Sequence, residues 1–177
     1  MALFEDVLRA LGRALVDTLA PRRRRKRAPA TKKRPARPST GYPGDFTGTP
    51  RLQYAPRTGA TANPGEICWT WVPYEEDHTE GKDRPVLIIG RDRDWLLGLG
   101  LTSQDHDQDR AQEARNGRYW VEIGTGDWDP SGRVSEVRVN RIIRVDPGAV
   151  RRVGARLDKA RFDQVAAGVR RYYRNGG

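Results

Sequence analysis

The feature that most constrains the fold is a series of short apolar runs, separated by polar loops, that begins at Pro64. We expect β-strands at residues 66–72, 85–90, 95–102, 118–123 and 134–145. The last run alternates well, with Val137 and Val139 on one face, and is then interrupted before Ile142 and Ile143. Short strands with little helix between them predict a small twisted barrel or sandwich.

Helical spacing of apolar residues appears at the C-terminal end. Residues 159–173 predict a helix that packs on the sheet, with Asp158 as its N-cap. Leu157 and Phe162 stand where a hydrophobic staple needs them. The expected fold is therefore mainly β with a C-terminal helix.

A different composition precedes Pro64. Residues 1–20 predict an amphipathic helix. Residues 21–63 combine a basic run with a tract rich in Pro, Gly, Ser and Thr, and we interpret them as a disordered linker. A structureless stretch of that length does not fit inside one compact domain, so we expect the domain to span 64–177.

The positive charge is concentrated in the linker. The net charge is +10, from 33 basic and 23 acidic residues, and ten of the basic residues lie between positions 22 and 37 without any acid. The rest of the chain is balanced, so a nucleic-acid contact is expected at this basic arm. Beside an apolar helix the arm also fits a membrane-surface anchor, and docking of the helix on a partner or a second subunit stays open. The arm opens with Arg22, Arg23, Arg24, Arg25, Lys26 and Arg27.

The sequence gives little support for disulfide-rich, membrane-spanning or zinc-binding proteins. Cys68 is the single cysteine, so no intrachain disulfide framework is expected, and a reducing cytoplasm fits. No apolar run reaches the length of a membrane-spanning helix. Two histidines and one cysteine do not make a zinc site, and we expect no metal and no cofactor.

Arg84 and the hydroxyl pair Thr102-Ser103 are the first candidates for chemistry. Arg84-Pro85 opens the most apolar strand, and Thr102-Ser103 ends the next one. A permanently charged fork of donors beside hydroxyl groups, held on rigid strands, is typical of a site for phosphate chemistry.

These motifs resemble the PemK/MazF-like toxin family in their order and spacing. The resemblance comprises Pro64-Gly65-Glu66-Ile67, a polar loop that ends in Gly81-Lys82-Asp83-Arg84-Pro85, and a strand that ends in Thr102-Ser103. Ser135 to Asn140, then Arg144-Val145-Asp146 and the final helix, resemble the closing part of that family. The resemblance covers about residues 64–173.

The resemblance implies a small SH3-like barrel, usually dimeric, that is neutralised by a cognate antitoxin. It also implies a metal-independent endoribonuclease that cuts single-stranded RNA at short sequences. Cleavage would proceed by attack of the ribose 2′-OH on the adjacent phosphate and leave a 2′,3′-cyclic phosphate and a 5′-OH.

The resemblance assigns the catalytic candidates by position. Arg84 and Thr102 carry over as the phosphate-side pair, Arg138 as an acid or phosphate ligand, and His78 as a loop histidine that some members share. Further RNA contacts are expected from Ser103, Glu80, Lys82, Asn140 and Trp128. Trp69, Trp71, Trp95 and Trp120 are expected to pack in the core or a dimer interface, whereas Trp128 is expected to be exposed in a turn.

One departure keeps a second function open. Asn140 stands where several members have an acid, and an amide cannot act as a general base. Either Glu80 or His78 takes that role, or Arg84 and Thr102 suffice. Otherwise the chain is a PemK-like binding module that has lost the base, tethered by its first 63 residues to nucleic acid, membrane or a partner protein.

Overall fold

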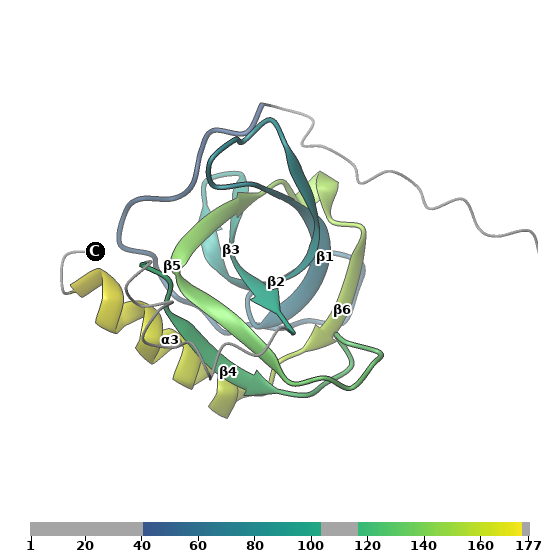
Figure 1. Cartoon of the computed structure of the whole chain (residues 1–177). Coiled ribbons are helices and arrows are strands. Elements are labelled where there is room, and N and C mark those ends of the chain that lie inside the picture. Colours follow the sequence, from purple (N-terminus) through teal and green to yellow (C-terminus); the bar gives the residue numbers. More distant parts are fainter. Residues whose placement is uncertain (1–40, 104–116, 175–177) are drawn as a thin grey trace, which may run out of the picture. The chain divides into compact units, whose positions relative to one another are not determined.

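The computed structural model describes residues 41–103 and 117–174, so the predicted helix at 1–20 and the basic arm lie outside the described residues. The described part forms a six-stranded antiparallel sheet that curls into a barrel (Figure 1). The sheet order is β4-β5-β3-β2-β1-β6. The elements are β1 Glu66–Pro73, β2 Gly81–Asp92, β3 Trp95–Thr102, β4 Trp120–Gly124, β5 Ser135–Val145, the 3-10 helix η2 Pro147–Ala149, β6 Arg152–Arg156 and α3 Lys159–Arg174.

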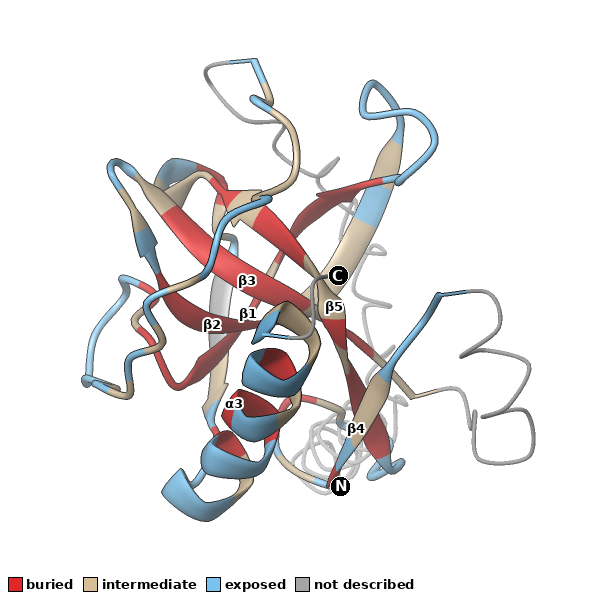
Figure 2. Ribbon diagram, turned by 90° about the vertical axis from the view of Figure 1, so that its left-hand side faces the viewer, coloured by how far each residue is buried: buried red, intermediate tan, exposed pale blue. Residues whose placement is uncertain are grey.

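Alternation along β2 explains why this sheet is buried on both faces. Leu87 and Ile89 belong to an apolar cluster that also includes one face of α3, whereas Val86 and Ile88 belong to a second cluster. Successive side chains of a strand point to opposite faces, so a continuous apolar run fits a strand that is covered on both sides. Buried segments accordingly line the strands and the inner face of α3 (Figure 2).

The helix α3 packs against β4 and β5 and begins as predicted. Asp158 accepts a hydrogen bond at Oδ1 from the backbone N–H of Arg161 at 2.9 Å, which satisfies a donor that the first turn leaves unpaired. Leu157 and Phe162 both lie in the apolar cluster beneath the helix. The predicted barrel with a C-terminal helix is confirmed.

Residues 41–63, which the sequence assigns to the linker, lie against the barrel in the structure. This segment, which we call the strap, runs along the barrel: the N–H of Phe46 donates to Ile142 O at 2.8 Å, and that of Gln53 donates to Ile89 O at 2.9 Å. Phe46, Leu52 and Tyr54 pack against the larger apolar cluster. Isolated side chains anchor the strap, so its apolar residues follow neither a helical nor a strand period. Its sequence is therefore similar to that of a linker.

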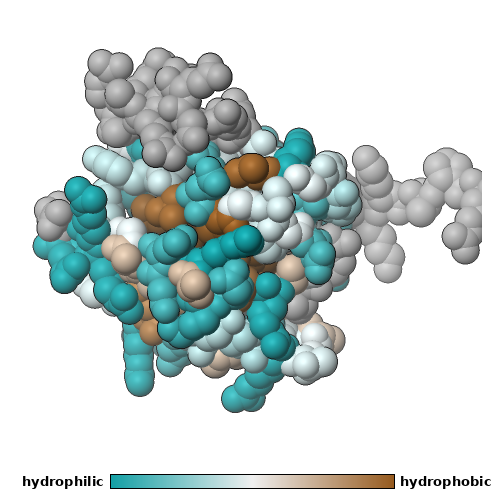
Figure 3. Space-filling view, turned by 90° about the horizontal axis from the view of Figure 1, so that it is seen from below, coloured by the Kyte–Doolittle hydropathy of each residue, from teal (hydrophilic) through white to brown (hydrophobic). Residues whose placement is uncertain are grey.

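The structure differs from the predicted strands in two further places. Strand β2 begins at Gly81, so part of the predicted loop extends the β1–β2 hairpin. Strand β6 was not predicted; it is a short edge strand that pairs with β1. Within the described residues, no helical segment combines the length and the apolar character that crossing a bilayer requires. Seen from below, the surface is largely hydrophilic, with a small area of apolar side chains (Figure 3).

Candidate active site

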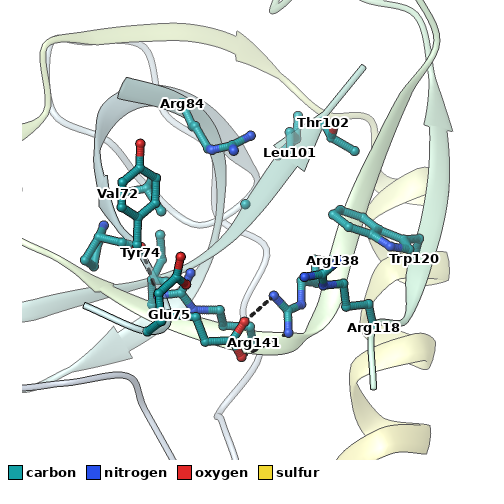
Figure 4. Close-up of a pocket in the computed structure, with 14 residues that line it drawn as sticks. Val72, Tyr74, Glu75, Arg84, Leu101, Thr102, Arg118, Trp120, Arg138 and Arg141 are labelled. Atoms are coloured by element: carbon teal, nitrogen blue, oxygen red, sulfur yellow. Dashed lines mark hydrogen bonds and ion pairs between the residues drawn. The ribbon is translucent and has the colours of Figure 1, made fainter. Parts of the chain in front are cut away.

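A register shift in β5 opens a cleft beside β3. Leu99 pairs with Ile142, but Leu101 pairs with Val137, so more residues of β5 than of β3 lie between the two pairs. Such a bulge bends the strand and re-aims its side chains. Arg138 and Arg141 lie in the bulged segment, and both line the cleft (Figure 4). This is the irregularity that the sequence predicted.

The cleft has a volume of about 300 Å³ and lies across the ends of several strands. The end of β1 and the loop after it form one wall, β2 and β3 a second, and β4 and β5 a third. The lining residues that carry chemistry are Tyr74, Glu75, Glu76, Arg84, Thr102, Arg118, Trp120, Arg138 and Arg141.

Arg84 provides a positive charge in this cleft that forms no ion pair with the described part of the chain. Its neighbour across the β1–β2 ladder is Thr70, and its guanidinium points into the cleft (Figure 4). Within residues 41–103 and 117–174, no acid or hydrogen-bond acceptor engages that guanidinium. Burial lowers the pKa of Arg84 below its ordinary value, and the positive charge of Arg141 acts in the same direction. An anion bound here would relieve both effects.

Thr102 lies on the strand beside Arg84. It is the last residue of β3, and Leu101 before it packs in the core, so alternation turns the Thr102 side chain toward the cleft. A second hollow of about 510 Å³ lies on the other side, lined by Lys82, Ser103 and the Trp128 ring among others. Arg84, Leu101 and Thr102 line both hollows, so they form a ridge between them.

Arg138 is held in place from two sides. Its Nη1 and Nη2 donate to the two carboxylate oxygens of Glu75 at 2.8 and 3.1 Å, and its Nε donates to Asn140 Oδ1 at 3.2 Å. These hydrogen bonds hold the pKa of Glu75 below its ordinary value. Sequence reasoning missed Glu75, because nothing in its loop indicates that it meets an arginine 63 residues away.

Asn140 has a structural role in this arrangement. Besides holding Arg138, its Oδ1 accepts from the backbone N–H of Tyr119 at 3.1 Å, and its Nδ2 donates to Gly117 O. It therefore ties β5 to the segment that leads into β4. Asn140 lines neither hollow, so its expected contact with RNA stays a prediction.

The strap fixes a further cation of the cleft, Arg141. Arg141 Nε donates to Asp45 Oδ2 at 2.7 Å, and its Nη2 donates to Pro73 O at 3.0 Å. Tyr42 in turn donates to Asp45. Arg138 and Arg141 are thus neutralised by acids, whereas Arg84 carries a charge available to a ligand.

The predicted loop residues lie away from this cleft. His78 and Glu80 are exposed and line neither hollow, and the His78 ring lies edge-on to Tyr42 with 5.0 Å between centroids. Lys82 lines the second hollow with Ser103, and its Nζ lies 6.0 Å from the centre of the Tyr74 ring.

The prediction that Trp128 is exposed is wrong. Its side chain is buried, 3 % exposed, and its Nε1 donates to Ser135 Oγ at 3.0 Å. A turn position says nothing about the direction of the ring, which here folds back onto the barrel. Trp71 is buried as expected, whereas Trp69, Trp95 and Trp120 are half-buried.

The arrangement suits the binding of a phosphate group. The ridge carries a threonine side chain and a guanidinium that no described residue engages. Aromatic side chains of Tyr74 and Trp120 lie beside it, and a carboxylate lies in the same cleft. Among the described residues, no three His, Cys, Asp or Glu side chains come together as a metal site would require.

Comparison with known proteins identifies a family. The family model described as "PemK-like, MazF-like toxin of type II toxin-antitoxin system" matches residues 63–173, which is more than half of the chain. No curated protein matches the chain.

Proposed function

The chain belongs to the PemK-like, MazF-like toxin family of type II toxin–antitoxin systems, and from that membership we propose that it is an endoribonuclease that cuts single-stranded RNA without a metal ion. The observation that carries the proposal is the Arg84 guanidinium, which enters the cleft beside Thr102 without an acidic partner among the described residues. Arg84 is half-buried, and no described acid pairs with it, so its charge is available to a phosphate.

Arg84 and Thr102 act on the scissile phosphate. The ribose 2′-OH attacks phosphorus in line with the leaving 5′-oxygen, and negative charge grows on the phosphate oxygens. The guanidinium and the hydroxyl stabilise that charge, which in a site of fixed donors supplies a large part of catalysis. The products are a 2′,3′-cyclic phosphate and a 5′-OH.

The two hollows favour an unpaired RNA strand. With the phosphate on the ridge, the nucleotides before and after it enter different hollows, which requires the bases to be unstacked. Tyr74 and Trp120 offer ring faces in the first hollow, and Ser103 and Lys82 offer donors in the second. Contacts of this kind would make cleavage sequence-specific.

A second function follows from Asn140. If the amide in place of an acid leaves the site without a base, the same ridge binds RNA without cutting it, and the chain is a tethered binding module. The Glu75–Arg138 ion pair favours the enzyme, because it places a carboxylate in the cleft where the sequence had suggested that one was missing.

The expected partners follow from the family. A cognate antitoxin would cover the cleft, and a homodimer, a cytoplasmic location and contacts of the arm with nucleic acid or a membrane surface stay proposals. Sedimentation of the purified chain tests the homodimer directly. A single species of 20.0 kDa would contradict it.

The test uses the full chain and a long single-stranded RNA in EDTA, with the new ends mapped. We expect a few defined cuts with 5′-OH ends, and loss of cutting in Arg84→Ala. Arg91→Ala is the matched control, because Arg91 lies on the same strand but lines neither hollow. Intact RNA at high protein excess would support the binding module instead.

A further inference from the structure

Glu75 is a carboxylate of the cleft that an arginine orients through two hydrogen bonds. The second acid that lines the cleft, Glu76, makes no such pair within the described residues; both side chains are exposed, that of Glu75 to 52 %. A general base works when a third group fixes its direction toward the reacting proton. Two parallel hydrogen bonds from Arg138, which is itself held by Asn140, provide that fixation.

We propose that Glu75 is the general base that takes the 2′-OH proton, and that Arg138 positions its carboxylate. This inference rests on the proposed ribonuclease function and names the residue that the sequence left open. It places the base in the loop after β1. On β5, Asn140 occupies the position where several family members have an acid.

Dimensions of the cleft allow this role. Arg84 and Glu75 line the same cleft of about 300 Å³ from different walls, so a phosphate held by Arg84 would place its ribose on the side of the carboxylate. Figure 4 shows Glu75 and Arg138 on the side of the cleft that faces Arg84. His78 and Glu80 line neither hollow, and an arginine does not give up its proton at neutral pH.

Binding of the phosphate would make Glu75 a better base. In the free protein the hydrogen bonds from Arg138 hold the pKa of Glu75 low, so the carboxylate is ionised but a weak proton acceptor. A phosphate in the cleft brings negative charge near Arg138 and weakens its effect on the carboxylate. The pKa of Glu75 then rises toward the working pH only when substrate is present.

The step balances without any further reactant. The 2′-oxygen forms a bond to phosphorus while its proton passes to Glu75, and the bond from phosphorus to the 5′-oxygen breaks. The leaving 5′-oxygen takes a proton from water in the open cleft. Glu75 returns its proton to solvent, which restores the carboxylate.

The test compares single-turnover cleavage by the full chain across pH. We expect Glu75→Gln to cut about 10²- to 10⁴-fold more slowly with RNA binding nearly unchanged, as the loss of a general base predicts. In the wild type, protonation of Glu75 should lower the rate at acidic pH. The rate of Glu75→Gln should not show this decrease. Glu75→Asp should recover part of the rate, and Glu122→Gln, an exposed acid on β4 outside both hollows, should match the wild type.

Each result decides a different claim. If the wild type cuts no RNA, the proposed function itself is refuted. If the wild type cuts and Glu75→Gln keeps its rate and pH profile, only the assignment of the base is refuted; the same holds if Glu80→Gln shows the loss instead. Should Glu75→Gln fail to fold, the carboxyl pKa of Glu75 in the wild type is titrated by NMR with a 2′-O-methyl RNA. A rise on binding supports the proposal, and an unchanged pKa overturns it.

Discussion

Replacing Arg84 with methionine should remove activity and slightly stabilise the fold. Methionine keeps most of the length of the side chain but carries no charge. Among the described residues the Arg84 guanidinium has no acidic partner, and burial and the charge of Arg141 both disfavour it. The folded protein therefore bears an electrostatic cost at Arg84 that the unfolded chain does not.

The size of that cost is modest. Arg84 and Arg141 line one cleft, and two like charges about 8 Å apart repel by about 0.5 kcal/mol in water. Arg138 and Arg141 are largely neutralised by Glu75 and Asp45, so roughly one such term remains, together with partial desolvation. A gain of about 0.5–1 kcal/mol corresponds to a rise in Tm of about 1–4 °C.

Calorimetry of the full chain at low and high salt measures this effect. The gain in Arg84→Met should shrink with salt, because ions screen the repulsion. Arg141→Met is the matched control: it breaks an ion pair and the hydrogen bond to Pro73 O, and should lower stability by about 1–3 kcal/mol. If Arg84→Met were as destabilising as Arg141→Met, Arg84 would be a structural partner and the case for a free phosphate-binding cation would fail.

Further outcomes follow from buried groups. Gly65→Ala should lower the free energy of unfolding in urea by about 1–3 kcal/mol. At Gly65 φ is 95°, and a Cβ would lie 2.7 Å from the Tyr54 ring. An unchanged midpoint would contradict the packing of the strap. Burial raises the pKa of Cys68 to about 12, so native protein at pH 8 should resist a thiol reagent that labels it fully in guanidinium chloride. Trp128→Phe should cost about 1–3 kcal/mol by leaving Ser135 Oγ buried without its donor, and native Trp128 should be shielded from acrylamide quenching.

The sequence predicted the elements that carry a clear period. Alternating or continuous apolar runs marked β1, β3 and β5 nearly to the residue, and Asp158 marked the start of α3, because burial and capping leave a local pattern. The missed strand β6 is a short edge strand whose middle residue is Gly154, so it has little alternation to detect.

Residues that meet only in the folded chain could not be predicted in the same way. Strap side chains such as Phe46 and Tyr54 are anchored singly, and Glu75 becomes a candidate only because a bulge in β5 brings Arg138 to it. Arg84 and Thr102, by contrast, lie near the ends of the apolar runs of adjacent strands, so their meeting at one ridge followed from the strand pattern.

The most direct test of the account is cleavage of an RNA that carries a single 2′-deoxy nucleotide at a mapped cut site. We expect the wild type to leave that linkage intact and to cut the all-ribose RNA to a 2′,3′-cyclic phosphate and a 5′-OH, and we expect Arg84→Ala not to make this cut. Cutting at the deoxy linkage, or unchanged cutting by Arg84→Ala, would contradict attack by the 2′-OH on a phosphate held by Arg84.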